Sequence, residues 1–440
     1  MPLTTKLIFR KFATRHRAVF VVLLLAAVTA TYKVCNHPSV ALFQIPVPAK
    51  QSSNDLPVMQ TSFASRTQNI HTHAASLVEL GDGRIRAFWF AGSREGAPDV
   101  EIRSAVFDPA SNRWGAEQSI VKREDTQRSL LRYVKKLGNP VPHRATDGTL
   151  WLFYVTVSLG GWAGSSITAI TSTDDGASWS ASRRLITSPF LNISTLVKGT
   201  PFNYSDGSIG LPVYHEFIGK FAELLRISQK GAIIDKFRLS SGNTSLQPVV
   251  LIKNPQSAMA LLRDAGAAPK RVIETVTDDA GQHWSVPIKT ALHNPDAAIT
   301  GVLLPEGKIL LALNDTEQGR AVLSLVISSD GGTTWKTVYQ LEDQQEPSTD
   351  TGRYVQVAAE LARATDTGIT DPADYARSAQ RNKCNGQGCG FEFSYPYLIQ
   401  AHSGDFHLVY TWNRSFIKHV RFTREWLDRH LERRADAQLH

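Results

Sequence analysis

The chain has 440 residues, of which 42% are hydrophobic and nine are tryptophans, a composition typical of a folded protein rather than a disordered one. Six basic residues and no acidic residue lie among the first 33 positions, so the rest of the chain keeps only +2 of the formal net charge of +8. Because the folded part is nearly neutral, the composition argues against a nucleic-acid-binding protein.

The N-terminal segment has the order of a secretory signal. Five basic residues precede an acid-free apolar run over residues 18–31, as in such signals. The run is short for a membrane span, and Val28-Thr29-Ala30 is acceptable as a cleavage site. We expect residues 1–33 to be a cleaved signal peptide or an anchor that attaches the chain to the inner membrane through residues 18–31. In both cases the rest is expected to be exported, to the periplasm or the extracellular space.

Residues 34–66 contain Pro and Ser and show weak periodicity, which predicts a linker. From His71 onwards, short apolar segments alternate with turns. Residues 74–80 and 85–90 flank Asp82-Gly83, a pattern typical of a β-hairpin. Long helical patterns are absent between the turns, so we predict an all-β fold. Further turns of this kind lie at Asp147-Gly148, Asp206-Gly207, Glu306-Gly307 and Gly404-Asp405.

A second kind of turn occurs three times. Each copy has a hydroxyl residue, Asp two positions later, Gly two positions after that, and Trp three positions further on. Asp and the hydroxyl residue can bind backbone amides of the turn, Gly accepts a positive φ, and Trp can fold back over the turn. Three matching copies indicate a repeat architecture. The copies span Ser172–Trp179, Thr277–Trp284 and Ser328–Trp335.

This pattern resembles the Asp-box, or BNR repeat, of sialidase-type β-propellers. The resemblance implies blades around a central axis, with the Asp-boxes at the periphery and their three tryptophans in equivalent places. The interleaved turns place blade starts near residues 70, 138, 193, 245, 295 and 390. Together they predict a six-bladed β-propeller over residues 67–422, with five or seven blades as the alternatives.

The stretch 343–389 interrupts the blade spacing. It is polar and predicts a short helix around residues 355–364, so it is either a functional loop or lid, or a tolerated surface insertion. Cys384 and Cys389 lie close together, which favours a loop-closing disulfide in an exported chain. No second Cys pair or closely spaced His pair accompanies them, so no metal site is expected. Residues 423–440 are basic and predict a helix on the propeller or a solvated tail.

Two segments could carry chemistry. The first is the Gly-rich stretch 92–100, which places Arg94, Glu95 and Asp99 between two strands, where propeller loops converge on the central channel. The second is residues 391–398, with Glu392 and Tyr395. An arginine can bind a substrate carboxylate through two parallel hydrogen bonds. The candidates for this role are Arg263 and, more weakly, Arg226 and Arg320.

These segments resemble those of sialidases. The resemblance implies that Tyr395 is the nucleophile, Asp99 the general acid and Arg263 a carboxylate-binding residue; a neutral nucleophile suits an anionic sugar, and sialidases depart from the two-carboxylate rule. Tyr has a reference pKa near ~10 and needs a neighbouring base. Glu392 is near in sequence, although a regular strand would turn it to the opposite face.

One position departs from the family pattern. His73 stands where sialidases place the first of three carboxylate-binding arginines, and a His can bind a carboxylate or act as an acid or base near neutral pH. The chain is similar to a bacterial group called predicted neuraminidases. The similarity rests on His73-Ala-Ala-Ser-Leu77, on Phe90–Val100, on Gly138-Asn139-Pro140 and on Ser394-Tyr395-Pro396.

The predicted function is a sialidase-like exo-glycosidase that hydrolyses a terminal acidic sugar from a glycan or exopolysaccharide, without a cofactor. One alternative is a polysaccharide lyase acting on uronates, with His73 and Tyr395 as base and acid. Another is a non-catalytic carbohydrate-binding propeller, with Trp89, Trp162 and Trp412 as stacking surfaces. The pattern specifies no oligomeric state. We expect five residues to converge at the central opening: His73, Arg94, Asp99, Arg263 and Tyr395.

Overall fold

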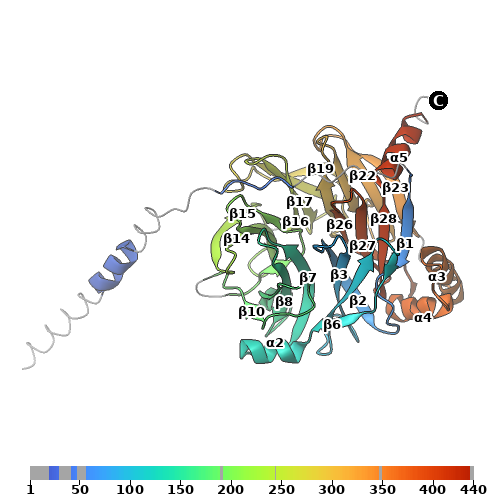
Figure 1. Cartoon of the computed structure of the whole chain (residues 1–440), viewed down its shortest axis with the longest axis horizontal. Helices are drawn as coiled ribbons and strands as arrows, with labels where there is room; N and C mark the ends of the chain where they lie inside the picture. Colours follow the sequence, from blue (N-terminus) through green and yellow to red (C-terminus); the bar gives the residue numbers. More distant parts are fainter. Residues whose placement is uncertain are drawn as a thin grey trace, which may run out of the picture. The chain divides into compact units, whose positions relative to one another are not determined.

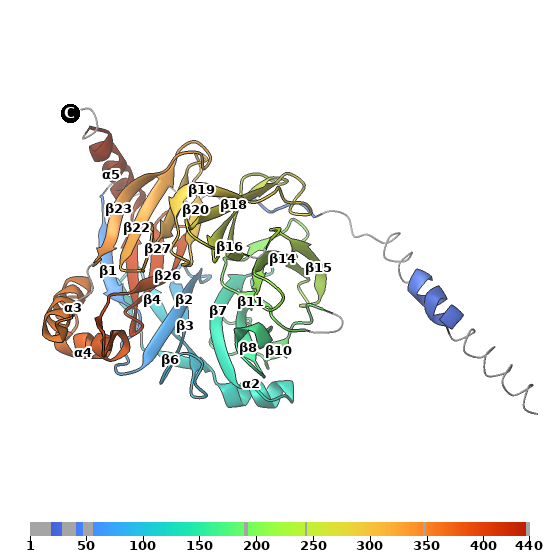
Figure 2. The same cartoon turned by 180° about the vertical axis from the view of Figure 1, so that it is seen from behind.

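The computed structural model describes residues 19–28, 41–46, 56–188, 192–242, 244–345 and 349–436. From residue 42 onwards the chain forms one compact unit, built mainly of six antiparallel sheets (Figure 1). Each sheet is one blade, and the inner strands β2, β7, β16 and β26 lie around the middle of this unit in both views (Figure 2). The predicted six-bladed propeller is therefore confirmed.

The blades start close to the predicted positions. Blade 1 contains β2 (His71–Glu79), β3 (Ile85–Gly92), β4 (Glu101–Asp108) and β5 (Arg113–Trp114), with β6 (Gln118–Val121) beside β4. Blade 2 contains β7 (Lys136–Arg144), β8 (Leu150–Val157), β9 (Ser165–Ser172) and β10 (Arg183–Arg184). Blade 3 contains β11 (Leu196–Val197), β13 (Ile209–His215), β14 (Phe221–Ile227) and β15 (Ile233–Arg238), with β12 (Phe202–Asn203) beside β13.

The second half repeats this order. Blade 4 contains β16 (Ser245–Ile252), β17 (Ala258–Asp264), β18 (Arg271–Thr277) and β19 (Ile288–His293). Blade 5 contains β20 (Thr300–Leu303), β21 (Ile309–Leu313), β22 (Val322–Ser328) and β23 (Lys336–Asp343). Blade 6 contains β26 (Phe393–Gln400), β27 (Phe406–Trp412), β28 (Phe416–Phe422) and, as its outer strand, β1 (Met59–Phe63).

β1 corrects the predicted linker. Its five residues pair with β28 from Met59 opposite Phe422 to Phe63 opposite Lys418, so the N-terminal side of the domain closes its last blade. Further upstream, Phe43 packs on Phe202 of blade 3, with ring centroids 5.4 Å apart. The linker prediction failed because β1 is short, and its partner lies more than 350 positions away in the sequence. The other residues of 34–66 lie partly outside the described ranges.

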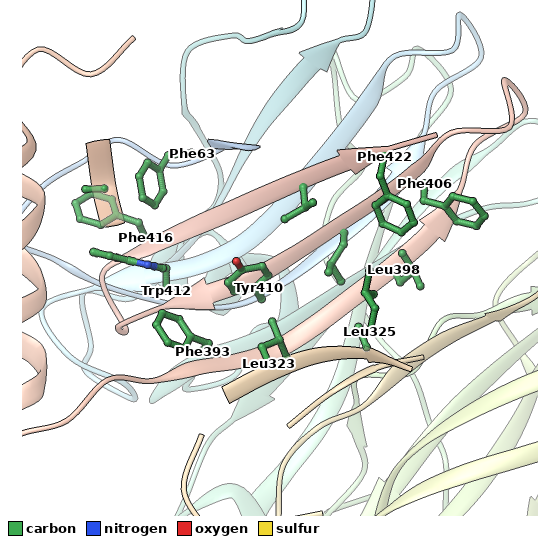
Figure 3. Close-up of a cluster of buried hydrophobic side chains, with 14 of the residues drawn as sticks. Phe63, Leu323, Leu325, Phe393, Leu398, Phe406, Tyr410, Trp412, Phe416 and Phe422 are labelled. Atoms are coloured by element: carbon green, nitrogen blue, oxygen red, sulfur yellow. The ribbon is translucent and has the colours of Figure 1, made fainter. Parts of the chain in front are cut away.

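The core between blades 5 and 6 is rich in aromatic rings (Figure 3). Phe63 of β1 is fully buried there and packs edge-on against Trp412 of β27, with ring centroids 5.5 Å apart. Burying one such side chain contributes about 2 kcal/mol, so β1 is held by packing as well as by its hydrogen bonds. The same cluster contains Leu323, Leu325, Phe393, Leu398, Phe406, Tyr410, Phe416 and Phe422.

The three Asp-boxes have the same geometry, as predicted. In the first, Ser172 Oγ donates to Asp174 Oδ1 at 2.7 Å, and the amide of Gly176 donates to Ser172 Oγ at 2.8 Å. In the second box the same two bonds measure 2.9 and 3.1 Å. In the third box they measure 2.7 and 2.8 Å. Each box joins the third strand of a blade to its fourth, and each Trp packs partly buried on a core cluster: Trp179, Trp284 and Trp335.

Alternating strand directions separate the connections into two groups. Connections between the first and second strands and between the third and fourth, which include the Asp-boxes, lie at one end of the propeller, here called the box end. Connections between the second and third strands and between blades lie at the opposite end, called the loop end. The stretches 92–100 and 343–389 are both loop-end connections.

The insertion contains two helices rather than one. α3 (Thr351–Thr365) begins after Asp350, whose carboxylate accepts bonds from two backbone amides, and α4 (Pro372–Lys383) begins with proline, a common first helical residue. Asn382 donates to the carbonyls of Ile70 and Arg414, so α4 is fixed to the propeller. β24 (Cys384–Asn385) and β25 (Gly388–Cys389) follow as a hairpin closed by the predicted disulfide.

Three further α-helical segments are described. α2 (Arg123–Leu130) connects blades 1 and 2 and was not predicted. α5 (Arg424–Asp436) is the expected C-terminal helix; its Trp426 and Leu427 are buried on the propeller, and it lies at the other end of β28 from α3 and α4 (Figure 2). Residues 19–28 are helical, while the rest of the predicted signal 1–33 lies outside the described residues. Among the described helices, none is long and apolar enough to span a membrane.

Candidate active site

The inner strands share a local distortion that turns polar side chains toward the axis. In four blades the pairing of the inner strand with the next one shifts register, as in a β-bulge, and each bulge contains one residue with a positive φ: Ala74, Asn139, Gln247 or Tyr395. In three of the four the next residue is proline. Proline cannot donate in a sheet ladder, so it is found at such bulges, and the X-Pro pairs were a sequence signal for them.

Tyr395 is the centre of the site. It is partly exposed, with φ near +56°, so its hydroxyl is not packed inside the blade. Arg263 Nη1 lies 3.5 Å from Tyr395 Oη, and Gln247 Nε2 lies 3.4 Å from the same oxygen. The ring of His73 lies 4.4 Å from the Tyr395 ring, centroid to centroid. The structure therefore brings together three of the five residues expected to converge.

Arg263 is fixed by its neighbours. Its Nε donates to Asp296 at 2.6 Å, and its Nη1 donates to Gln247 Oε1 at 3.1 Å. Burial opposes its charge, but the Coulombic interactions with Tyr395 and Asp296 raise the pKa of the guanidinium above its ordinary value. Arg263 is therefore a permanent cation at the hydroxyl of Tyr395, held in one orientation by a carboxylate and an amide.

A cationic cavity adjoins Tyr395 on the side of blades 5 and 6. It has a volume of about 350 Å³, and Arg320, Lys383 and Arg414 line it together with one carboxylate, Glu392. Arg320 Cζ lies 5.9 Å from the centroid of the Tyr395 ring. Three cations around one carboxylate leave positive charge for an anionic ligand, and a cavity of this size lies in the range of ligand sites.

Glu392 organises this cavity rather than acting as a base. Lys383 Nζ lies 2.7 Å and Arg414 Nε 2.8 Å from its Oε2, and Ser394 donates to its Oε1. Burial raises the pKa of the carboxyl, but Lys383 and Arg414 outweigh burial and hold it far below its usual range. A carboxylate this well stabilised is a weak base, which argues against the catalytic role predicted for Glu392.

Arg414 was missed by sequence reasoning. It lies in the short β27–β28 turn, with a positive φ, and its Nη1 also donates to Glu95 Oε2 at 3.1 Å. It thereby connects the 92–100 loop of blade 1 to blade 6. A lone Arg in a three-residue turn has no local sequence signal, because its partners come from two distant segments.

His73 does not replace an arginine. It is only 3% exposed, and burial together with the nearby Arg414 lowers its pKa well below the ordinary value. The neighbouring His71 is affected in the same way, by burial and then Arg414, with a pKa of about 4. A neutral imidazole supplies no charge for a carboxylate, so burial and Arg414 argue against both the ion-pairing role expected of His73 and its titration near neutral pH.

Glu216 is a second residue that sequence reasoning missed. It follows β13 in the loop-end connection of blade 3. Burial raises the pKa of its carboxyl above the ordinary value, while Arg263 and Lys220 act in the opposite direction. Tyr214, two positions before it, accepts bonds from Asn139 and Gln247. A carboxyl with a raised pKa beside Arg263 is suited to proton transfer.

The 92–100 loop stands apart from the axis. Asp99 accepts two bonds of 2.9 Å from Ser93, one from its amide and one from its hydroxyl. Asp99 and Arg94 are exposed, whereas Glu95 binds Arg414. The loop lies at the same end as Tyr395, but the structure does not bring Arg94 and Asp99 into contact with it.

Arg226 lies at the box end of the propeller, opposite the loop end that contains Tyr395. It donates from Nε to Ser208 at 3.0 Å and forms an ion pair with Asp206, and both partners belong to the box-end turn before β13. A substrate-binding role for Arg226 is therefore wrong: sequence order does not reveal at which end of a strand a residue falls.

The tryptophans expected as sugar-stacking surfaces are engaged elsewhere. Trp89 and Trp412 are fully buried. Trp162 is partly exposed, but Lys136 Nζ lies 3.7 Å from the centroid of its ring, and its ring edge packs on Gly138. The stacking roles of Trp89 and Trp412 are wrong, and Trp162 already contacts a cation through its ring.

The fold and the axial cluster define the chain as a sialidase-type β-propeller. A family model described as a BNR repeat-like domain matches residues 83–408. The chain therefore belongs to the BNR repeat-like family. No protein with a curated description matches the chain significantly.

Solved structures share this fold at low sequence identity. A Hadza microbial sialidase, Hz136, is 15% identical with a TM-score of 0.59, and the match covers 81% of this chain and 66% of that one. The intramolecular trans-sialidase of Ruminococcus gnavus is 12% identical with a TM-score of 0.57, covering 83% and 97%. A protein of unknown function from Dyadobacter fermentans is 13% identical with a TM-score of 0.59, covering 86% and 100%.

Proposed function

We propose that this protein is a sialidase-like exo-glycosidase that removes a terminal acidic sugar from a glycan or exopolysaccharide. The observation that supports it most is the partly exposed Tyr395, whose hydroxyl lies 3.5 Å from the Arg263 guanidinium and whose ring lies 5.9 Å from Arg320, one of three cations that line a cavity. A phenol needs positive charge nearby to ionise, and an acidic sugar needs a cationic pocket. The site offers both within one cluster.

In this proposal the acidic group of the sugar binds Arg263, Arg320 and Arg414, so Arg414 contributes the cation that His73 cannot. Tyr395 Oη attacks the anomeric carbon as its proton passes to Glu216, and the bond to the leaving oxygen breaks as Asp99 protonates that oxygen. Water then releases the sugar in a second displacement. The step requires the exposed 92–100 loop to bring Asp99 towards the axis when a substrate binds.

A direct test uses fluorogenic aryl glycosides of acidic sugars, sialic acids and hexuronic acids among them, with purified protein. Turnover of at least one of them is expected, and Tyr395→Phe should lower kcat by about 10²-fold or more. The control is Tyr339→Phe, which alters a ring packed on Trp426 of α5. Full activity of Tyr395→Phe would contradict the mechanism.

One observation favours a polysaccharide lyase as the second candidate. His73 is neutral, and its ring lies 4.4 Å from the Tyr395 ring. In a β-elimination, His73 would act as the base and Tyr395 as the acid. A lyase leaves an unsaturated product that absorbs in the ultraviolet, whereas a hydrolase leaves a reducing end without that absorbance. Product absorbance therefore separates the two.

We further propose that the propeller acts outside the cytoplasm. The basic and then apolar N-terminus and the Cys384–Cys389 disulfide motivate this proposal, because such disulfides persist in oxidising compartments. Fractionation of tagged protein combined with thiol alkylation tests it. Cytosolic protein with both thiols free would contradict it.

A further inference from the structure

The insertion between blades 5 and 6 is bonded to the propeller along one face of α4. Ser378 and Asn382 lie one helical turn apart on this face. The hydroxyl of Ser378 accepts a bond of 3.1 Å from the amide of Asn69, just before β2. Asn382 Nδ2 donates to the hydroxyl of Ser415 at 2.9 Å, in the turn between β27 and β28. These bonds fix α4 to blade 1 and to blade 6.

Aromatic packing holds the rest of the insertion, in which α3 and α4 lie side by side (Figures 1 and 2). Tyr375 of α4 stacks on Phe416 of blade 6, with ring centroids 4.3 Å apart. Tyr354 of α3 is buried, and its ring centroid lies 4.5 Å from that of Phe391, which lines the cationic cavity. Burial of each such ring contributes about 2 kcal/mol. The insertion is therefore a packed wall of the cavity rather than a lid.

The disulfide hairpin joins two segments of this wall. Lys383 directly precedes Cys384, Gly390 directly follows Cys389, and both flanking residues line the cavity. The amide of Gly390 donates to the carbonyl oxygen of Lys383 at 3.4 Å. The backbone of Lys383 is thus held from two sides, by α4 before it and by the closed hairpin after it.

The ammonium group of Lys383 lies in a cluster of unlike charges. Its Nζ lies 2.7 Å from Glu392 Oε2, and its side chain is 19% exposed. An ammonium group has three donors, and this bond uses one of them. Arg320 and Arg414 line the same cavity, and Glu95 binds Arg414 from outside it. Three cations therefore face two carboxylates, and the excess of one positive charge suits a singly charged group such as a carboxylate.

We propose that Lys383 binds the acidic group of the sugar, so that the insertion supplies a specificity-determining residue of the site. This inference rests on the proposed function, which assigns the acidic group to Arg263, Arg320 and Arg414. Lysine is a compact point charge with rotatable donors, and the ion pair with Glu392 holds Lys383 in place before a ligand arrives. An acidic sugar is thus distinguished from a neutral one partly by a residue outside the six blades.

A purely structural role for Lys383 predicts something different. In that case Lys383 only neutralises Glu392, so removing Lys383 from a Glu392→Gln protein would leave the affinity for anions unchanged. A direct role predicts a loss of affinity whether or not Glu392 carries a charge. A double-mutant cycle separates the two roles, because it isolates the interaction between two side chains in contact.

The experiment introduces Lys383→Met into the wild-type protein and into Glu392→Gln. Titration calorimetry measures the binding of free N-acetylneuraminic acid and of glucuronic acid, each beside the neutral amide of the same sugar. These monosaccharides have no glycosidic bond to an aglycone, so binding is measured without turnover. Lys383→Met should raise the dissociation constant of the acid by about 10-fold in both proteins, and that of the amide by less than about twofold.

Lys336→Met is the matched control. Lys336 is exposed at the start of β23, at the box end, so its removal changes the net charge equally but not the cavity. It should change the dissociation constants by less than about twofold. Lys383→Arg keeps the charge and should bind the acid within about threefold of the wild type. Melting curves show whether each variant is folded, and Lys383→Gln replaces Lys383→Met if the latter unfolds.

Each outcome decides the inference. A loss of affinity seen only where Glu392 is present, or an equal loss for acid and amide, overturns it and leaves Lys383 as the partner of Glu392. Failure of the wild-type protein to bind either acid also overturns it, even if the glycosides are hydrolysed. Acid binding that depends on Lys383, in a protein that hydrolyses none of the glycosides, supports the inference and rejects the proposed hydrolase instead.

Discussion

Arg414 Nε lies 2.8 Å from Glu392 Oε2, and this contact places a guanidinium from the last blade beside the candidate nucleophile, where blade 1 provides only a neutral histidine. The two residues are 22 positions apart: Glu392 directly precedes β26, and Arg414 lies in the turn between β27 and β28. The ion pair orients Arg414 in advance of any ligand, and preorganisation of this kind strengthens anion binding.

Replacing Arg414 by Ala should therefore weaken substrate binding more than turnover. A charge-assisted hydrogen bond contributes about 1.5–3 kcal/mol, so KM for an acidic glycoside should rise about 10- to 100-fold, with a smaller change in kcat. Arg424→Ala is the matched control, since Arg424 forms ion pairs with Asp428 and Glu306 on α5 and the box end. Steady-state kinetics of the two variants provide the measurement, and an unchanged KM in Arg414→Ala would remove Arg414 from the site.

Asp99→Asn should reduce turnover by about 10²-fold, and most for substrates with poor leaving groups, because such groups need protonation as the glycosidic bond breaks. The chain offers a close control in Asp108→Asn. Asp108 accepts bonds from a backbone amide and a serine hydroxyl, as Asp99 does, but in the β4–β5 turn. Kinetics with a series of aryl leaving groups test this, and equal losses for good and poor leaving groups would argue against Asp99 as the acid.

The Asp-boxes should make stability depend on acidity. Hydrogen bonds from Ser178 and Ser172 lower the pKa of Asp174 from 3.8 to about 2, and bonds from Thr334 and Ser328 do the same for Asp330. Since the folded-state pKa is lowered, this stabilisation is complete above about pH 4 and is lost as the pH falls towards 2. The melting temperature of the double variant Asp174→Asn/Asp330→Asn should change less with pH over this interval than that of the wild type. Parallel curves for variant and wild type would show that the boxes do not couple to protonation.

Gly199→Ala should destabilise the propeller by about 1–3 kcal/mol, as overpacked sites do. The added Cβ would lie 2.0 Å from the carbonyl oxygen of Pro248 and 3.0 Å from Pro212 Cβ, so blades 3 and 4 would have to separate at the axis. Gly386→Ala is the control, because its Cβ would meet nothing within 4 Å. Urea unfolding of both variants gives the comparison, and equal midpoints would show that the inner strand can relax.

The sequence was most informative where its signals are local. The Asp-boxes, the Asp-Gly turns and the Cys384–Cys389 pair each depend on residues a few positions apart, and the structure contains all of them. Tyr395, Arg263 and His73 were placed together by the family resemblance, and their proximity is seen in the structure. Their roles as nucleophile and anion-binding groups stay predictions.

What the sequence could not show depends on contacts between distant segments. β1 needs β28 to become a strand, and Arg414 needs Glu392 and Glu95 to become part of a site. The environment of Glu392 could not be read from the sequence either, because the two cations that stabilise its carboxylate come from the insertion and from a turn. Arg226 illustrates a further limit, since the two ends of a strand look alike in a sequence.

The pairing of β1 with β28 also affects the order in which the protein can be built. The strand that completes the ring is synthesised more than 350 residues before its partner. Until residue 422 is available, β1 has no neighbour and blade 6 presents an open edge, which is the kind of surface that pairs with other chains. A nascent or truncated chain lacking β28 is therefore expected to aggregate. In a circular permutant that joins residues 56–63 directly after α5, β1 is synthesised shortly after β28, so the last blade should form as soon as both strands are available.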